Sequence, residues 1–191
     1  GKSGPCEVRG AGSASRVRDF EPQAQPAQNP APGAPFTLGA LVQTNFGRRG
    51  DLTIAGGPLG KRLHAPGDPP QAGPGSVMIV LATDAPLSER QLGRICRRAA
   101  VGLARTGSAL SHGSGDFVIA FSTARLPGPS AGPFALRPTL IDEAGVLERF
   151  FRATAEAVEE AVLNSLFAAE TITGRDGHTA HALPIDQALS F

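Results

Sequence analysis

The sequence has neither tryptophan nor tyrosine, so its large buried side chains must come from ten phenylalanines and the aliphatic residues. Two cysteines cannot form a disulfide framework, and Cys96 among apolar helix positions predicts a buried thiol, in keeping with a reducing compartment. The longest apolar run, residues 77–82, is far too short to cross a bilayer. With no signal peptide visible, we expect a cytoplasmic protein, although a longer precursor would also allow a periplasmic location.

A strong charge of either sign is also missing. Eighteen Lys and Arg against 17 Asp and Glu leave a net charge of +1, which argues against nucleic acid or an acidic membrane surface as partner. Gly1-Lys2-Ser3 lacks the preceding strand and glycine of a phosphate-binding loop. His178 and His181 have no third ligand at a recognisable spacing, so we expect neither a metal nor a cofactor.

Glycine and proline are abundant, with 24 and 17 residues, and their clustering predicts long loops. Residues 19–35 are rich in Pro, Gln, Asn and Ala, which is typical of a flexible excursion. Residues 64–75 read as a second loop from composition. The length of 191 residues suits one domain with a real core.

The apolar patterns predict a mixture of strands and helices. Residues 36–45 alternate as a strand does, residues 51–55 suit a short strand, and residues 76–83 and 117–122 suit strands buried on both faces. Ser88 and Gln91 form a capping box that opens a helix ending at Gly107. A long helix is expected over residues 142–172, stopped by Gly174, and the tail is expected to be a loop with one helical turn.

The order strands, helix, strand, helix predicts an α+β fold in which helices cover one side of a sheet. The other face of that sheet then needs further structure upstream of this sequence, or a partner.

Gly75 and Ser76 stand where the second loop meets a predicted strand. Glycine has no Cβ, so a nucleophile can approach its carbonyl closely. If the Ser76 hydroxyl attacks that carbonyl, the peptide bond becomes an ester that water releases, and Ser76 becomes an N-terminus. Its free α-amine, with a reference pKa of about 7.7–8.0, could then serve as general base for its own hydroxyl. On the residues alone, a plain turn is the commoner reason for a Gly-Ser pair.

Several long sequence segments favour the cleavage interpretation of Gly75-Ser76 over a plain turn. In chain order they are GPCEVRGAGSASRV, LGALVQTNFGRR, GSVMIVLATDAPLSERQL, RRAAVGLARTGS, SHGSGDFVIAFSTA and EEAVLNSLFAAETITGRDGHTAHALP. The sequence resembles the family of L-aminopeptidase/D-Ala-esterase-amidases and β-peptidyl aminopeptidases over nearly all of its length, the Pro-rich stretch excepted. The resemblance implies a precursor cut between Gly75 and Ser76. Residues 1–75 then end the α-subunit, and residues 76–191 form the β-subunit of the same domain.

The resemblance also implies a four-layer αββα sandwich like that of the N-terminal-nucleophile hydrolases, with different connectivity. Members begin further upstream, so this sequence is expected to lack the N-terminal half, which adds to the substrate pocket. The implied assembly is a homo-oligomer, a tetramer of processed protomers. The implied substrates are short peptides, amides or esters, and the acyl preference stays open among L-, D- and β-amino acids.

Residue by residue, the resemblance assigns Ser76 as nucleophile and Asn45 as the amide donor to the oxyanion. Ser114 would hydrogen-bond the nucleophile or its amine, and Asp116 would hold an ammonium group by charge. Some relatives carry Glu at the position of Asp116. Without the resemblance, Asn45 reads as a residue at a strand end and the GSGD segment as a loop with an Asx turn.

The sequence therefore predicts a hydrolase, a self-processing serine aminopeptidase acting through an acyl-enzyme on Ser76. Two alternatives remain. A non-catalytic or incomplete relative would serve as an assembly module. An acyltransferase of the related fold is the other, although the ornithine acetyltransferases use Thr where this chain has Ser76.

Overall fold

The computed structural model describes residues 13–17, 36–64, 75–125, 139–141 and 143–190. Their centre is a four-stranded sheet in the order β1-β2-β3-β4. The strands are β1 (Ser13–Val17), β2 (Phe36–Asn45), β3 (Ser76–Thr83) and β4 (Gly115–Ser122). β1 and β3 run antiparallel to β2, whereas β4 runs parallel to β3. The starts of β3 and β4 therefore lie beside the end of β2.

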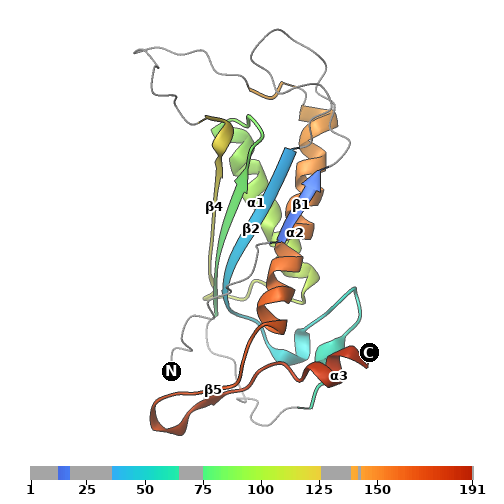
Figure 1. The fold of residues 1–191 in the computed structure, drawn as a ribbon, viewed down its shortest axis with the longest axis vertical. Coiled ribbons are helices and arrows are strands. Elements are labelled where there is room, and N and C mark those ends of the chain that lie inside the picture. The colour runs from blue at the N-terminus through green and yellow to red at the C-terminus, as the bar shows by residue number, and fades with distance from the viewer. Residues whose placement is uncertain (1–12, 18–35, 65–74, 126–138, 142, 191) are drawn as a thin grey trace.

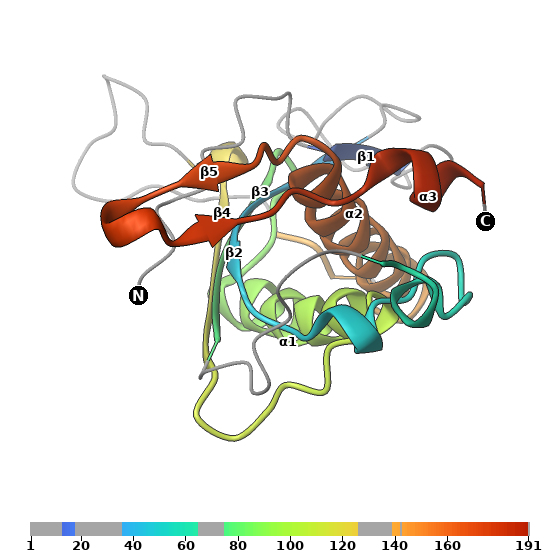
Figure 2. The same ribbon diagram turned by 90° about the horizontal axis from the view of Figure 1, so that it is seen from below.

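Two helices cover one face of this sheet (Figures 1 and 2). Helix α1 (Glu89–Arg105) packs on β4 and on α2 (Glu148–Phe167), which lies over β1 and β2. The predicted capping box is confirmed, because Ser88 accepts from the Gln91 N–H while the Gln91 side chain accepts from the Ser88 N–H. Gly102 brings the helices close together, since a Cβ there would lie 2.6 Å from the Ala155 carbonyl oxygen.

The core fills the space between the sheet and these helices. It is built from alternate residues of β2 and β3, with Leu38, Ile79 and Leu81 each 1% exposed, and from the apolar faces of both helices. Cys96 is half-buried on α1, and desolvation raises the pKa of its thiol above the usual value. The described residues thus supply one sheet layer and one helical layer of the four expected.

The expectation that two strands are buried on both faces is wrong. Both helices lie on the same side, so the other face, here called the open face, carries exposed apolar side chains. Their exposed fractions are Leu41 54%, Met78 48%, Phe117 61%, Ile119 62% and Phe121 48%. The apolar runs predicted burial on both faces of the sheet. An apolar run does not show which part of a protein covers each face, and no layer that covers the open face is among the described residues.

Several boundaries also differ from expectation. Residues 51–55 are not a strand, because Ala55 and Gly56 take positive φ and close a tight turn with one isolated Ile54–Gly57 bridge. Two 3₁₀ turns flank it, at Arg49–Asp51 and Leu59–Lys61. Strand β1 was missed, and β4 begins at Gly115 rather than at Phe117.

The long helix predicted over residues 142–172 is shorter. A π-helical turn at Glu143–Leu147 precedes α2, which ends at Phe167 rather than at residue 172. A small hairpin of β5 (Ile172–Thr173) and β6 (Thr179–Ala180) follows, then the expected helical turn α3 (Ile185–Leu189). In Figure 1 this C-terminal segment lies beneath the end of the sheet where β3 begins. Within the described ranges, no helix is long and apolar enough to span a membrane.

Candidate active site

Asn45 and Ser76 meet at one end of the sheet. Asn45 closes β2, Ser76 opens β3, and the two are register partners. Both are exposed and continue the row of open-face residues, since their strand neighbours Thr44 and Val77 belong to the helix-covered side. The alternation of the two strands therefore sends an amide and a hydroxyl out side by side.

Gly75 is tightly enclosed by the end of β2. A Cβ at this position would lie 2.7 Å from Phe46 Cα and 2.8 Å from the Asn45 carbonyl oxygen, so only glycine fits without a backbone shift. The Gly115 N–H donates a hydrogen bond of 3.2 Å to the Gly75 carbonyl oxygen. The carbonyl that precedes Ser76 is thus fixed and polarised by a backbone donor.

Gly115 also leaves room for the Ser76 hydroxyl. The two residues are register partners across the parallel β3–β4 pair. A Cβ on Gly115 would lie 3.1 Å from Ser76 Oγ, which is tighter than ordinary contact. The second glycine of the GSGD segment therefore keeps the space beside the hydroxyl open.

Ser114 and Asp116 form a pair of their own. Ser114 Oγ donates a hydrogen bond of 2.7 Å to Asp116 Oδ1. Asp116 is the register partner of Val77, which is 1% exposed, so its side chain leaves β4 toward the helix-covered side. Within the part of the chain that the structure describes, no hydrogen bond joins Ser76 Oγ to Ser114 or Asp116. The four predicted residues thus gather at one end of three adjacent strands, but on two faces.

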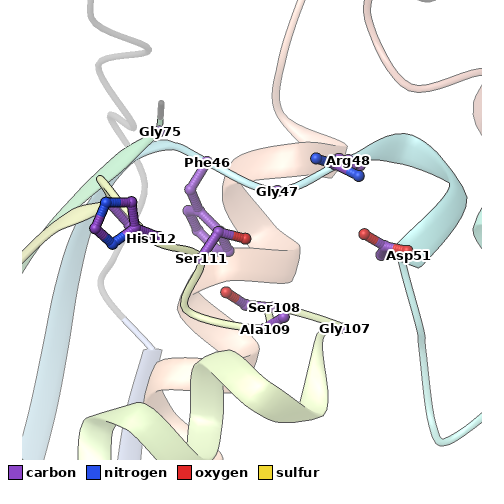
Figure 3. A pocket seen from close by; sticks show the side chains of 11 residues that line it. Phe46, Gly47, Arg48, Asp51, Gly75, Gly107, Ser108, Ala109, Ser111 and His112 are labelled. Atoms are coloured by element: carbon purple, nitrogen blue, oxygen red, sulfur yellow. The ribbon is translucent and has the colours of Figure 1, made fainter. Parts of the chain in front are cut away.

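Two adjoining pockets open at this end of the sheet. The smaller, about 170 Å³, is lined by Gly75 and Ser114 together with the loop of residues 107–112 (Figure 3). The larger, about 560 Å³, is lined by Asn45, the C-terminal segment of residues 179–184 and the end of α2. Phe46, Gly47 and Arg48 line both. Sequence reasoning missed this shared wall, because the direction of a turn after a strand leaves no periodic signal.

His178 and His181 are exposed in the C-terminal segment, and His181 lines the larger pocket. No group of three His, Cys, Asp or Glu side chains that could hold a metal ion occurs among the described residues.

The sequence pattern of peptidase family S58 matches residues 8–180. The beta-peptidyl aminopeptidase BapA of Sphingosinicella microcystinivorans is 38% identical over 195 residues, covering 92% of this chain and 45% of that protein.

Two solved structures are also similar. A protein of Pyrococcus horikoshii OT3 has a TM-score of 0.73 and 48% identity over 83% of this chain and 42% of its own. The L-aminopeptidase D-Ala-esterase/amidase of Ochrobactrum anthropi, described as a variant of the Ntn-hydrolase fold, has a TM-score of 0.71 and 40% identity over 83% and 43%. The α+β fold is therefore that of these structures over the matched part, and the chain spans less than half the length of each relative.

Proposed function

The chain belongs to peptidase family S58, and from that premise we propose that it carries the nucleophile of a self-processing serine aminopeptidase. The observation that carries the proposal is the placement of Ser76. The Ser76 hydroxyl follows the fixed Gly75 carbonyl in the chain, and the register partner of Ser76 is Asn45. Gly115, the partner on β4, has no side chain that could fill the space beside the hydroxyl.

Self-processing begins when Ser76 Oγ attacks the Gly75 carbonyl carbon. The oxygen of that carbonyl takes up negative charge in the tetrahedral intermediate, and the Gly115 N–H already donates to it. The C–N bond then breaks, the Ser76 nitrogen takes a proton, and Gly75 is left as an ester on the hydroxyl. Water hydrolyses this ester, which leaves a carboxylate on Gly75 and a free α-amine on Ser76.

The new amine supplies the base for substrate hydrolysis. At its reference pKa of about 7.7–8.0 it is partly neutral at physiological pH and can take the hydroxyl proton as Ser76 attacks a substrate acyl carbon. Asn45 would donate its amide N–H to the oxyanion. The leaving amine departs with that proton, and water releases the N-terminal residue from the acyl-enzyme. Short peptides, amides and esters are the proposed substrates.

Ser114 is the proposed partner of the nucleophile's amine, and Asp116 acts through it. A hydroxyl has one hydrogen to donate and two lone pairs to accept with. Because Ser114 donates its hydrogen to Asp116 over 2.7 Å, its lone pairs remain to accept from an ammonium or hydroxyl at residue 76. The negative charge on Asp116 strengthens that acceptor, since hydrogen bonds to a charged group are the stronger ones.

The open face supports a further part of the same precursor as partner. Five large apolar side chains lie exposed on it, and such patches on soluble proteins usually mark an interface. The matched relatives are more than twice as long as the aligned part. We propose that the remaining half of the precursor supplies the second sheet, and that processed protomers assemble further, as a tetramer.

Intact-mass analysis of the full-length precursor tests the central claim. The wild type should separate into two chains divided between Gly75 and Ser76, and a sulfonyl fluoride should label the chain that begins with Ser76. Ser76→Ala should stay in one piece, without activity, while Ser122→Ala, at the opposite end of β4, should process normally. A wild-type chain that stays uncut yet hydrolyses peptides would rule the proposal out.

A further inference from the structure

Arg48 occupies the wall that the two pockets share, three residues after Asn45 along the chain. Figure 3 shows Arg48 and Asp51 at one side of the smaller pocket, with Gly75 and His112 at the other. The cation therefore stands across the pocket from the bond that self-processing would break.

The guanidinium of Arg48 has no ionic partner among the described residues. Arg48 is exposed, and although Asp51 lines the same two pockets, no ion pair joins them within 4.0 Å. Other arginines are paired, as Arg105 is with Glu159 at 3.2 Å. Arg48 thus presents unused donors in a planar fork, which is the geometry that binds a carboxylate through two parallel hydrogen bonds.

The larger pocket has the size and lining of a small-ligand site. Its volume of about 560 Å³ lies within the usual range of roughly 300–1,000 Å³. Its walls include Phe46, Leu63 and Leu183, and its charged side chains are Arg48, Arg49 and Asp51, with His181 as a further titratable group. The exposed guanidinium of Arg48 favours the negative end of a ligand.

The spacing sets the length of that ligand. Three residues of extended chain span at most about 10 Å, so the Cα atom of Arg48 lies within that distance of the Cα atom of Asn45. Because Asn45 is the register partner of Ser76, this upper limit favours a leaving group of one or two residues between the acyl carbon and the cation. The negative charge at its far end is then the C-terminal carboxylate of a short peptide.

We propose that Arg48 binds the C-terminal carboxylate of the leaving group, so that the enzyme favours free di- and tripeptides over their amides. This assignment rests on the proposed function, because it presumes an acyl carbon at Ser76. Arg48 is a specificity-determining residue, which contributes to substrate binding but not to self-processing, since the precursor presents no free carboxylate at that point.

The test compares each substrate with its own amide on the processed full-length enzyme. The substrates are the dipeptides Ala-Ala, D-Ala-Ala and β-Ala-Ala, each as the free acid and as the C-terminal amide. Measuring which of them are hydrolysed shows whether the enzyme cleaves after L-, D- or β-amino acids. Wild type should show a kcat/KM for the acid about tenfold or more above that for the amide. Arg48→Gln should raise KM for the acid by about 10- to 100-fold and bring the acid-to-amide ratio close to one.

Three further measurements separate the outcomes. Arg48→Lys should lose part of the preference, because it keeps the charge but not the fork. Lys61→Gln removes an exposed cation that lines neither pocket and should leave the ratio unchanged. Mass analysis of self-cleavage shows that each variant has folded. A wild type without acid preference, or an Arg48→Gln that slows acid and amide equally, overturns the assignment alone. A wild type that neither cuts itself nor hydrolyses any substrate overturns the proposed function with it.

Discussion

Asn45 lies directly opposite Ser76 in the antiparallel β2–β3 pair, and both side chains leave the sheet on its open face. This pairing joins the last residue of one strand to the first residue of the next across a connection of 30 residues. It is a register effect, since a slip by one residue would send one of the two side chains into the core. The relative position of Asn45 and Ser76 is therefore set by the register of the β2–β3 pair.

Asn45→Ala should slow both self-cleavage and peptide hydrolysis by about 10²- to 10³-fold, because one donor to the oxyanion is removed. In the isolated 191-residue chain the thermal midpoint should change little, since the side chain is exposed there. Gln43→Ala, two residues earlier on the same face, is the matched control and should process at the wild-type rate. Timed mass spectra of freshly refolded precursor measure the first step. Equal rates of peptide hydrolysis for Asn45→Ala and wild type would exclude an oxyanion role.

Gly75→Ala should impair processing through geometry alone. Its new Cβ would sit 2.7 Å from Phe46 Cα, so the backbone must move and the fixed carbonyl leaves its place beside Gly115. We expect self-cleavage to slow by about tenfold or more and stability to fall by about 1–3 kcal/mol. Gly39→Ala, on the same strand pair, has nothing within 4 Å of its Cβ and should do neither. An unchanged rate in Gly75→Ala would show that the carbonyl position does not limit the reaction.

Ser114 and Asp116 should behave as one unit. Ser114→Ala and Asp116→Ala are each expected to lower kcat by about 10- to 100-fold, and the double variant should be little worse than either, because Asp116 acts through Ser114. Asp116→Asn keeps an oxygen for the Ser114 hydroxyl and should be milder. If the two losses multiply in the double variant, Asp116 acts on the nucleophile independently of Ser114.

The elements that sequence reasoning predicted well are those with a local cause. The alternation of residues 36–45 and the Ser88–Gln91 capping box depend on neighbours a few residues away, and both are confirmed. The strand over residues 76–83 also has the predicted bounds. By contrast, β1 is short and its pairing to β2 spans the Pro-rich stretch of residues 19–35, which lies outside the described residues.

The roles assigned to the candidate site residues stay predictions, and the geometry of these residues could not be predicted from the sequence. The resemblance named Asn45, Ser76, Ser114 and Asp116, and the sheet brings all four to one end. That Asp116 faces the side opposite Ser76 follows from the register of β3 with β4, which depends on long-range pairing. The apolar alternation of residues 117–121 was likewise read as full burial, since composition does not tell a covered face from an open one.

Gln187 on α3 should hold the chain that precedes the cleavage loop. Its amide oxygen accepts from the His64 N–H over 2.8 Å, and its Nε2 donates to the His64 carbonyl over 3.1 Å. Gln187→Ala should cost about 1 kcal/mol locally, because both bonds are exposed, and should speed hydrogen exchange at the His64 amide about fivefold. Gln187→Glu keeps the acceptor and should leave that amide protected. Unchanged exchange in Gln187→Ala would show that α3 is not anchored in solution.

The open face gives a direct test of the proposed second half of the precursor. Ile119 is 62% exposed on β4, so Ile119→Ser in the isolated 191-residue chain should alter its free energy of unfolding by less than about 0.5 kcal/mol. In the full-length precursor the same change should cost about 2–4 kcal/mol, because a covering layer would bury that side chain. Ile172→Ser, with 62% exposure on β5, is the control expected to be mild in both. Urea titration of the four variants and their two wild-type parents measures the difference. A mild effect of Ile119→Ser in both chains would mean that the face remains in water and that the rest of the precursor packs elsewhere.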